Sequence, residues 1–351
     1  MEYEFNKGYY HFAKDLNAYP DAWCYVVWSS RGQGKTYSAL WYALVNSIPV
    51  AYIKRTKDDV ELICTDDKEV GIKTSPYVPI NRDHDTDVKA TLIKKGVGGF
   101  YRPEDDAPIT YCFALSSAKS VKGFDVSVVD WMLFDEFIPQ AGEIVRHAEG
   151  EMMLDMYMTI SRDREQRGRP PLKLILFANS EDIATPITRE LEIIDDMAEM
   201  NNIKGDNIRY LDDRGILLHK VAGMHKYDNT GIFAAMSQTA WGRKTFGAEF
   251  SHNDFSCVAS LSLRGMKPII HLQHKSHDYY IYRRYVDGLL YMCASKAKCI
   301  REYNLDREID AKRFYVDDCI DLMNDCIDDK MRFQKYSMYD LIMNYKRYFD
   351  I

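Results

Sequence analysis

A short stretch near the start of the chain has the residue types that bind nucleotide phosphates. After an apolar run, residues 23–28, come Ser29, Ser30, Arg31, Gly32, Gln33, Gly34, Lys35 and Thr36, and residues 37–44 then have a helical pattern. A strand, a glycine-rich turn and a helix start direct backbone N–H groups and the positive end of the helix dipole at one point, which favours an anion. The lysine adds a charge for the outer phosphates, and the threonine hydroxyl is a ligand for Mg²⁺.

This loop departs from the phosphate-loop pattern G-x-x-x-x-G-K-[ST] at its first position, where the chain has Ser29. A glycine-rich turn before a helix is also a common tight connection, so the motif alone leaves that alternative open. Nucleotide chemistry requires further groups for Mg²⁺ and for an attacking water, and these must come from other strand ends.

A second stretch supplies two carboxylates. The near-continuous apolar run of residues 128–134 ends in Asp135 and Glu136, which is typical of a buried strand with acids at its tip. Beside a phosphate loop, Asp135 is expected to hold Mg²⁺ through water, and Glu136 to orient and polarise the attacking water. The two motifs together favour a nucleotide-hydrolysing site over an ordinary charged strand end.

Two later segments offer groups for the same site. A helix expected over residues 151–160 is followed by four arginines, of which Arg162 is our candidate for a finger that stabilises charge on a γ-phosphate, in cis or in trans. The alternative for these arginines is a solvated turn. A buried strand over residues 172–177 leads to Asn179, which either senses the γ-phosphate or caps a turn.

Basic residues also follow other expected elements. Residues 54–57 come after a strand expected at 50–53, and the carboxyl ends of parallel strands face the ligand crevice. They either meet phosphate or form a solvated loop. A hairpin over residues 90–101 carries Lys94 and Lys95 near its turn, where they are candidates for nucleic-acid contacts. The aromatic-rich residues 3–19 fit a strap on the core better than a lid over adenine.

The sequence resembles the DNA-packaging (encapsidation) ATPases of small tailed bacteriophages, which are relatives of the terminase large subunit. Four segments carry the resemblance in this order: the loop with Arg31, the Leu-Phe-Asp-Glu-Phe strand, the Ser-Arg-Asp-Arg-Glu turn and the Phe-Ala-Asn-Ser strand end. The resemblance covers about residues 20–182. It implies an α/β, ASCE-type P-loop NTPase fold with a mainly parallel sheet, in which the strand leading to Asn179 lies between the phosphate-loop strand and the Asp135 strand.

The resemblance also implies ATP and Mg²⁺ as cofactors and double-stranded DNA as cargo. It implies a homo-oligomeric ring, pentameric in the family, that docks transiently on the capsid portal of a prohead in the host cytoplasm and has ATP sites at subunit interfaces. Carried over by position, the residues of the chemistry are Lys35, Thr36, Asp135 and Glu136. Arg162 resembles the finger given to the neighbour, and Lys57 and Lys119 resemble lysines near the interface site. Whether Arg31 senses nucleotide in its own subunit or in the adjoining one stays open.

The expected domains are an ATPase domain over residues 1–202, a small linker or lid subdomain over 203–248, and a C-terminal domain over 249–351. From residue 249 the hydrophobic pattern has period two, with strands expected at 255–263, 268–272, 278–282 and 288–293, and two helices close the chain. This order fits an RNase-H-like α+β fold. Its Asp254, Asp278 and Asp287 form no obvious constellation for two-metal chemistry, so we expect a DNA-binding remnant without nuclease activity.

Composition sets wider bounds. The 351 residues, 46% apolar and 28% charged, are typical of a soluble globular protein. No apolar run reaches the ~20 residues that span a bilayer, and the first residues lack a signal-peptide pattern, so we expect no membrane partner. Eight scattered cysteines indicate reduced thiols rather than a zinc site. The formal charge of −7 excludes a uniformly basic coat and permits a local basic track.

Two other functions remain open from the sequence. A monomeric kinase for a small molecule would need a substrate lid and no arginine from a neighbour, and the β-rich C-terminal part argues against it. A non-hydrolysing, nucleotide-gated scaffold would leave Glu136 without a role.

Overall fold

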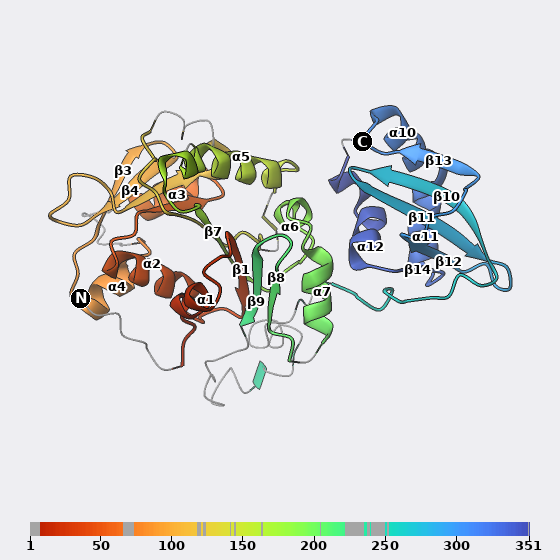
Figure 1. Cartoon of the computed structure of the whole chain (residues 1–351), viewed down its shortest axis with the longest axis horizontal. Helices are drawn as coiled ribbons and strands as arrows, with labels where there is room; N and C mark the ends of the chain where they lie inside the picture. Colours follow the sequence, from red (N-terminus) through yellow and green to blue (C-terminus); the bar gives the residue numbers. More distant parts are fainter. Residues whose placement is uncertain are drawn as a thin grey trace. The chain divides into compact units, whose positions relative to one another are not determined.

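The computed structural model describes residues 8–65, 74–117, 121, 124–140, 142–143, 145–162, 164–203, 205–221, 235–236, 239, 250, 253–349 and 351. The chain divides into two compact units. The N-terminal unit comprises Met1–Glu190 and Met200–His252, and the C-terminal unit comprises Leu191–Glu199 and Asn253–Ile351 (Figure 1).

A nine-stranded sheet forms the centre of the N-terminal unit, with the order β3-β4-β5-β2-β6-β7-β1-β9-β8. The strands from β5 to β9 in this order are parallel, and β3, β4 and β8 are joined antiparallel at the two edges. The strands are β1 (Cys24–Ser29), β2 (Val50–Lys54), β3 (Lys89–Lys94), β4 (Val97–Tyr101), β5 (Thr110–Ala114), β6 (Trp131–Asp135), β7 (Lys173–Asn179), β8 (Ile208–Leu211) and β9 (Ile216–Val221).

The strand order confirms the expected arrangement around the phosphate loop. β7 lies between β1 and β6, and its register pairs Asn179 with Ser29 and Phe177 with Asp135. Because these strands are parallel, their carboxyl ends lie at one edge of the sheet, where a ligand crevice forms. The phosphate loop, the two carboxylates and Asn179 therefore all come from one edge.

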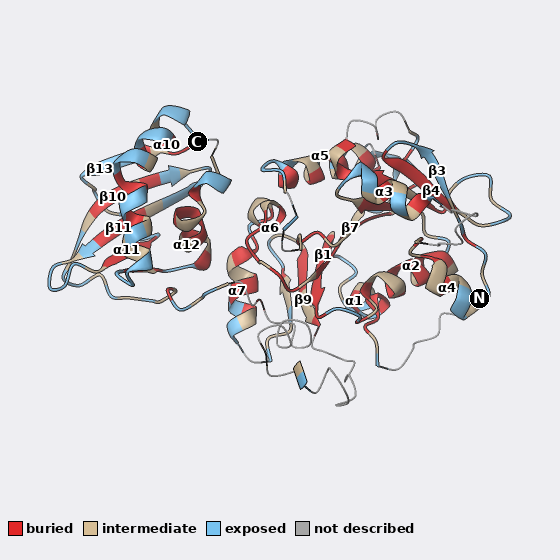
Figure 2. Ribbon diagram, turned by 180° about the vertical axis from the view of Figure 1, so that it is seen from behind, coloured by how far each residue is buried: buried red, intermediate tan, exposed pale blue. Residues whose placement is uncertain are grey.

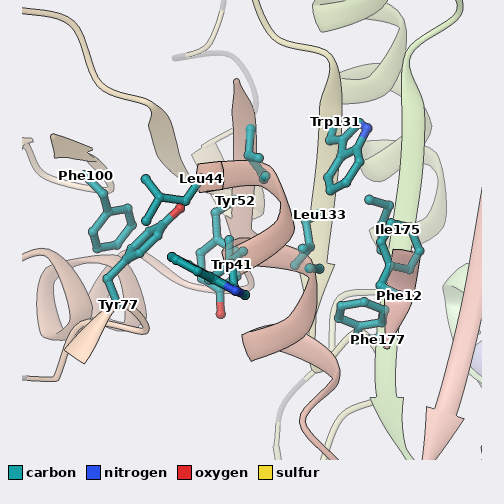
Figure 3. Packing of buried hydrophobic residues seen from close by; sticks show 14 of the residues in the cluster. Phe12, Trp41, Leu44, Tyr52, Tyr77, Phe100, Trp131, Leu133, Ile175 and Phe177 are labelled. Atoms are coloured by element: carbon teal, nitrogen blue, oxygen red, sulfur yellow. The ribbon is translucent and has the colours of Figure 1, made fainter. Parts of the chain in front are cut away.

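Helices cover this sheet. They are α1 (Phe12–Ala18), α2 (Lys35–Val45), α3 (Lys57–Cys64), α4 (Val78–His84), α5 (Glu149–Ser161) and α6 (Pro186–Glu190). On one face, Phe12 and Trp41 pack against Tyr52, Leu133 and Phe177 in a single buried cluster (Figure 3). Each fully buried side chain of this size contributes about 1.5–3 kcal/mol, so the cluster fixes α2, and with it the phosphate loop, on the sheet.

The central strands are buried on both faces, as their continuous apolar sequences predict. The edge strand β3 is instead mostly exposed (Figure 2). In α5, Met153 and Met156 are buried with Ile160, as expected for methionines that serve packing, whereas Met158 is exposed. The expected hairpin of residues 90–101 is β3–β4.

The structure has two compact units, whereas we expected three domains with boundaries at residues 202 and 248. β8 and β9 come from the range that we assigned to a linker subdomain, yet β9 extends the large sheet beside β1, with Ile216 opposite Cys24. The helix α7 (Ile194–Asn202) begins in the C-terminal unit. There the Asp195 carboxylate accepts hydrogen bonds from the backbone N–H and hydroxyl of Ser337.

The C-terminal unit contains a five-stranded sheet of order β13-β10-β11-β12-β14. Its strands are β10 (Met266–His274), β11 (His277–Arg284), β12 (Leu290–Cys293), β13 (Arg301–Asn304) and β14 (Met331–Phe333), and its helices include α10 (Glu308–Phe314), α11 (Ile320–Ile327) and α12 (Tyr336–Met343). β10, β11 and β12 lie at three of the expected strands and form an antiparallel meander, and the helices α10 and α11 come between β13 and β14.

One expected strand of this unit is wrong. Residues 255–263 pair with β14 only around Val258, where Cys257 and Ala259 exchange backbone hydrogen bonds with Phe333. The pairing is short because β14 has three residues, so the alternating pattern of 255–263 instead marks an edge segment.

Other expectations concern cysteines, metals and membranes. All eight cysteines are free and six of them are buried, and their reduced state stays a prediction. Within the described ranges, no group of three His, Cys, Asp or Glu residues is placed to hold a metal ion. The absence of nuclease activity stays a prediction. No helix among the described residues is long and apolar enough to cross a membrane.

Candidate nucleotide site

The phosphate loop connects the end of β1 to the start of α2. Gly32 and Gly34 have φ values of 74° and 80°, in the left-handed region that L side chains rarely adopt. A Cβ on Gly34 would also lie 3.3 Å from the ring of Tyr9, which packs against the loop. The backbone N–H of Tyr10 donates to the Gln33 carbonyl over 2.9 Å, so the N-terminal segment is tied to the loop, as expected for a strap.

The serine that replaces the first glycine of the motif sits in regular strand geometry. Ser29 is the last residue of β1 and pairs with Asn179 on one side and Val221 on the other. A strand residue has negative φ, so this position does not need glycine. The Ser29 hydroxyl accepts a hydrogen bond of 2.5 Å from the Lys35 ammonium, which gives the substitution a specific contact.

Lys35 is held inside the loop. It is 8% exposed, and its ammonium also lies 3.4 Å from the Asn179 amide oxygen. Burial lowers the pKa of Lys35 to about 8, although the charges of Asp135 and Glu136 oppose this shift. An incoming phosphate would add negative charge beside this buried lysine and favour its charged form.

The two carboxylates have different environments. Asp135, the last residue of β6, accepts a hydrogen bond of 2.9 Å from the Tyr52 hydroxyl of the neighbouring strand. Burial and the Asp135 charge raise the pKa of Tyr52 well above its usual value, so the phenol remains a donor. This contact occupies one oxygen of Asp135 and orients the carboxylate at the cleft.

Glu136 has a φ of 58°, an unusual value for a side chain other than glycine and one that costs roughly 1 kcal/mol. The turn directs its carboxylate away from the regular path of β6. One carboxylate oxygen lies 3.4 Å from the Lys54 ammonium, and the other accepts a hydrogen bond of 3.3 Å from the Gln140 amide. The amide oxygen of Gln140 accepts a hydrogen bond of 2.7 Å from Arg31.

These groups border one cleft of about 210 Å³, lined by Gly32, Gln33, Gly34, Lys35, Thr36, Tyr37, Asp135, Glu136, Ala178 and Asn179. The expected residues Lys35, Thr36, Asp135, Glu136 and Asn179 are therefore brought together. Hydroxyl and carboxylate oxygens are the ligands that Mg²⁺ prefers, and it is usually held by one or two such groups together with substrate phosphates. Thr36 and Asp135 fit this requirement.

The arginines after α5 divide into two kinds. Arg164 is buried and donates to the Val129 carbonyl and the Asp130 carboxylate, and Arg169 also contacts Asp130. Both fasten the turn to the start of β6. Arg162, which follows the last residue of α5, is exposed and does not line the 210 Å³ cleft of its own chain.

A second, larger cleft of about 380 Å³ opens beside the ends of β2 and β5. It is lined by Arg55, Thr56, Lys57, Asp58, Lys95, Leu115, Ser116, Arg146, Glu149 and Met152. The structure thus brings Lys57, from the basic segment after β2, to Lys95 of the hairpin turn, where the Lys57 side chain packs over Gly96. Lys119, the other expected interface lysine, lies outside the described residues.

Arg55 connects this second cleft to the loop after Glu136. Its guanidinium pairs with the Glu149 carboxylate over 3.0 Å and with Glu143 over 2.8 Å, and donates to the carbonyls of Glu136 and Phe137. Burial raises the pKa of Glu149, and the adjacent guanidinium opposes that shift. Arg55 therefore joins the segment after β6 to the first turn of α5.

Sequence reasoning missed Tyr52 and Gln140 and left Lys54 and Arg55 undecided. The position of Tyr52, within a strand at the carboxyl edge, was a usable signal once β2 was known to neighbour β6. Gln140 follows Glu136 by four residues in an irregular segment, and no local pattern marks it.

No protein-family model matches the sequence, and comparison with curated proteins gives no match either. The structure, however, is similar over nearly its whole length to two solved structures. "The Phi-28 gp11 DNA packaging Motor" has a TM-score of 0.64 at 17% identity and covers 99% of both chains. "The bacteriophage Phi-29 viral genome packaging motor assembly" has a TM-score of 0.62 at 15% identity and covers 97% of this chain and 99% of that one. The chain therefore has the α/β fold of these phage packaging-motor proteins, divided into an N-terminal unit and a C-terminal unit.

Proposed function

We propose that this protein is an ATP-hydrolysing motor subunit that moves double-stranded DNA into a preformed prohead. The observation that carries the proposal is the cleft at the carboxyl edge of the sheet, where Lys35, Thr36, Asp135 and Glu136 converge in a chain with the fold of packaging-motor proteins. Packaging motors are the proteins named for both whole-chain structural neighbours, and the cleft has the groups for phosphoryl transfer to water.

Each group has a defined part in the chemistry. Mg²⁺ would supply positive charge for the phosphates when bound, held by the Thr36 hydroxyl and, through water, by Asp135. Lys35 binds the outer phosphates, and Glu136 holds and polarises the attacking water. Asn179, beside Lys35 at the end of β7, contacts the γ-phosphate or that water.

The charge that develops on the γ-phosphate requires a further cation, and we assign it to Arg162 of a neighbouring subunit. Arg162 is exposed at the end of α5 and does not line the cleft of its own chain, so its position suits a contact with a neighbouring subunit. An arginine supplied in trans makes hydrolysis depend on the interface. This assignment calls for a ring, pentameric by the resemblance, that docks on the capsid portal in the host cytoplasm.

The 380 Å³ cleft is our candidate site for binding phosphates other than those of the ATP in the subunit's own nucleotide cleft. Lys57, Lys95 and Arg146 line it together, and Arg55 is paired with Glu149. These cations suit a DNA backbone phosphate or the nucleotide of a neighbour, and Lys119 is a further candidate from the resemblance. Binding through phosphates would weaken steeply with salt, by about 0.9 logarithmic units per contact for each tenfold rise in salt.

ATP turnover measured with and without duplex DNA separates the motor from its rivals. The motor predicts turnover that DNA stimulates and that Glu136→Gln reduces by about 10²–10⁴-fold while nucleotide binding persists. A small-molecule kinase would hydrolyse ATP at a rate that DNA does not change. A nucleotide-gated scaffold would bind ATP, but neither the wild type nor Glu136→Gln would hydrolyse it. A ring-forming preparation that hydrolyses ATP at the same rate with and without DNA would contradict the motor.

A further inference from the structure

Two helices of the C-terminal unit carry a row of exposed apolar residues on their outer side. One π-helical turn, Tyr315–Cys319, joins α10 to α11, and Phe314 and Leu322 pack in the core of the unit. The exposed apolar residues recur at heptad spacing and are Ile309 (71% exposed), Val316 (72%), Ile320 (43%) and Ile327 (72%) (Figure 2). An apolar row of this kind on a helix is typical of a surface that another molecule covers.

Acidic side chains border this row and define the chemistry of its partner. Asp317 and Asp321, which directly follow Val316 and Ile320, are exposed, and within the described ranges no cation pairs with either carboxylate. The segment 314–329 has six aspartates and neither lysine nor arginine. These charges repel the phosphates of nucleic acids, so the partner has to be both apolar and basic. We call the four apolar residues with Asp317 and Asp321 the acidic stripe.

The turn between β11 and β12 has the complementary properties. Tyr285 and Val286 at this turn are 73% and 92% exposed. Just before them, Arg283 lies opposite Lys267 in the register of β10 and β11, and both side chains are exposed. We call these four residues the hairpin tip.

The two cations of the hairpin tip indicate that it binds an acidic surface. Like charges directly opposite each other on neighbouring strands destabilise a sheet. Among the residues that the structure describes, no carboxylate pairs with Lys267 or Arg283. An acidic partner would therefore relieve the repulsion between them while it covers the exposed tyrosine and valine.

We propose that the hairpin tip of one subunit docks on the acidic stripe of a neighbouring copy of this chain. The apolar side chains of the tip cover the apolar row of the stripe, and Arg283 and Lys267 face Asp317 and Asp321. Because the two surfaces differ, the contact is head-to-tail, which is the kind of contact that closes into a ring. The inference rests on the proposed ring and gives it a contact in the C-terminal unit that is independent of Arg162.

The first test introduces a charge on each surface of the full-length protein. Val286→Asp and Val316→Asp change highly exposed positions, so both variants should unfold in urea like the wild type. Each should lower the association constant, measured by sedimentation equilibrium without nucleotide, by about tenfold or more. Ile300→Asp, at a position of the same unit that is 68% exposed and outside both surfaces, is the control and should associate like the wild type. Association of either test variant within about threefold of the wild type would overturn the inference.

Mixing the two variants tests whether the contact is head-to-tail. Val286→Asp keeps an intact acidic stripe, and Val316→Asp keeps an intact hairpin tip. The mixture should therefore form dimers with one intact contact and assemble no further. If stripes paired with stripes instead, Val286→Asp alone would assemble like the wild type, which would contradict the proposal.

Charge reversal tests the ionic part of the contact. Arg283→Glu and Asp321→Lys should each weaken association, because each places like charges against each other. In the double variant the charges are opposite again at every interface, so the association constant should return to within about threefold of the wild type. Losses that simply add in the double variant would show that the two side chains do not meet.

DNA is the competing partner for the hairpin tip, and anisotropy of a labelled duplex measures it. The proposal predicts that Arg283→Glu weakens association of the subunits. If Arg283→Glu instead lowers only the affinity for DNA, the tip is a nucleic-acid contact and the inference is overturned. Wild-type protein that stays monomeric would refute the proposed ring as well, whereas variants that still assemble would refute only this contact, so the two failures are distinguishable.

Discussion

The ammonium of Lys35 donates a hydrogen bond to the hydroxyl of Ser29 over 2.5 Å, at the position where phosphate loops have their first glycine. Both residues are buried, and the Ser29 hydroxyl in turn donates to the Ser30 carbonyl over 2.6 Å. The loop thus binds its own lysine, and a phosphate has to compete with a protein hydroxyl for it. This contact makes the departure from the motif testable.

Ser29→Ala removes the hydroxyl that competes with phosphate. A net hydrogen bond of this kind contributes about 1 kcal/mol, so the empty protein should lose stability and bind ATP several-fold more tightly. Titration calorimetry with a non-hydrolysable ATP analogue measures the affinity. Ser38, whose hydroxyl bonds to the Lys35 carbonyl and not to its ammonium, provides the control variant Ser38→Ala. Weaker nucleotide binding by Ser29→Ala would mean that the hydroxyl contacts the nucleotide instead.

Nucleotide affinity should depend on pH through Lys35. Its pKa of about 8 leaves it charged below pH 7 and increasingly neutral above pH 8. Bound phosphates favour the charged form, so binding takes up a proton in alkaline solution. Affinity should be flat from pH 6 to 7 and fall above pH 8, by at most about tenfold per pH unit.

The same titration performed in two buffers of different ionisation enthalpy counts the protons. Uptake should rise from near zero at pH 6.5 towards one proton per nucleotide above pH 8. Proton release, or affinity that is constant up to pH 9.5, would show that Lys35 is fully charged in the empty loop.

Arg55 should be important for the stability of the N-terminal unit. Arg55→Met leaves the buried Glu149 carboxylate without its partner and removes donors from the carbonyls of Glu136 and Phe137. Loss of one member of a buried pair costs about 3–5 kcal/mol, measurable as a lower free energy of unfolding in urea. The double variant Arg55→Met with Glu149→Gln should recover part of the loss. Arg82→Met, at an exposed pair with Asp83, is the control and should change little. If Arg55→Met and Arg82→Met had the same free energy of unfolding, the contacts of Arg55 would not stabilise the N-terminal unit.

Mixed subunits test whether Arg162 acts on a neighbour. Arg162→Ala lacks the finger and Lys35→Ala lacks a working phosphate loop, so each protein alone should be inactive. In a mixture, some interfaces combine a subunit that has Lys35 with a neighbour that has Arg162. ATP turnover should reappear in proportion to the number of such interfaces. Arg167→Ala, an exposed arginine of the same turn, should be active alone. A mixture that stays inactive while forming rings would place the arginine's action within its own chain.

The sequence predicted the phosphate loop, the carboxylate strand and the central sheet well, because these depend on local apolar runs and on fixed spacing within a motif. The position of the Asn179 strand between the phosphate-loop strand and the Asp135 strand was implied by the resemblance, and the strand order agrees with it. Ser29 was unexplained at that level. Its explanation needs the backbone angle at the strand end and the position of Lys35, neither of which a motif specifies.

The contacts around Glu136 were beyond sequence reasoning for a physical reason. Lys54 and Gln140 reach the carboxylate through strand adjacency and an irregular loop, and Arg31 lies 109 residues from Gln140 along the chain. The arginines after α5 show the same limit. Arg162 and Arg164 are alike in sequence, and only the position of Asp130 at the start of β6 separates the structural arginine from the exposed one.

The most direct test of the account is displacement of a triplex-forming oligonucleotide from duplex DNA by assembled rings, because only a protein that moves along the duplex removes the third strand. Wild type should displace the strand with ATP and Mg²⁺ and fail with a non-hydrolysable analogue. Glu136→Gln should bind the same DNA and displace nothing. Hydrolysis of ATP by rings on this DNA without displacement, or displacement that Glu136→Gln retains, would contradict a motor driven by this site.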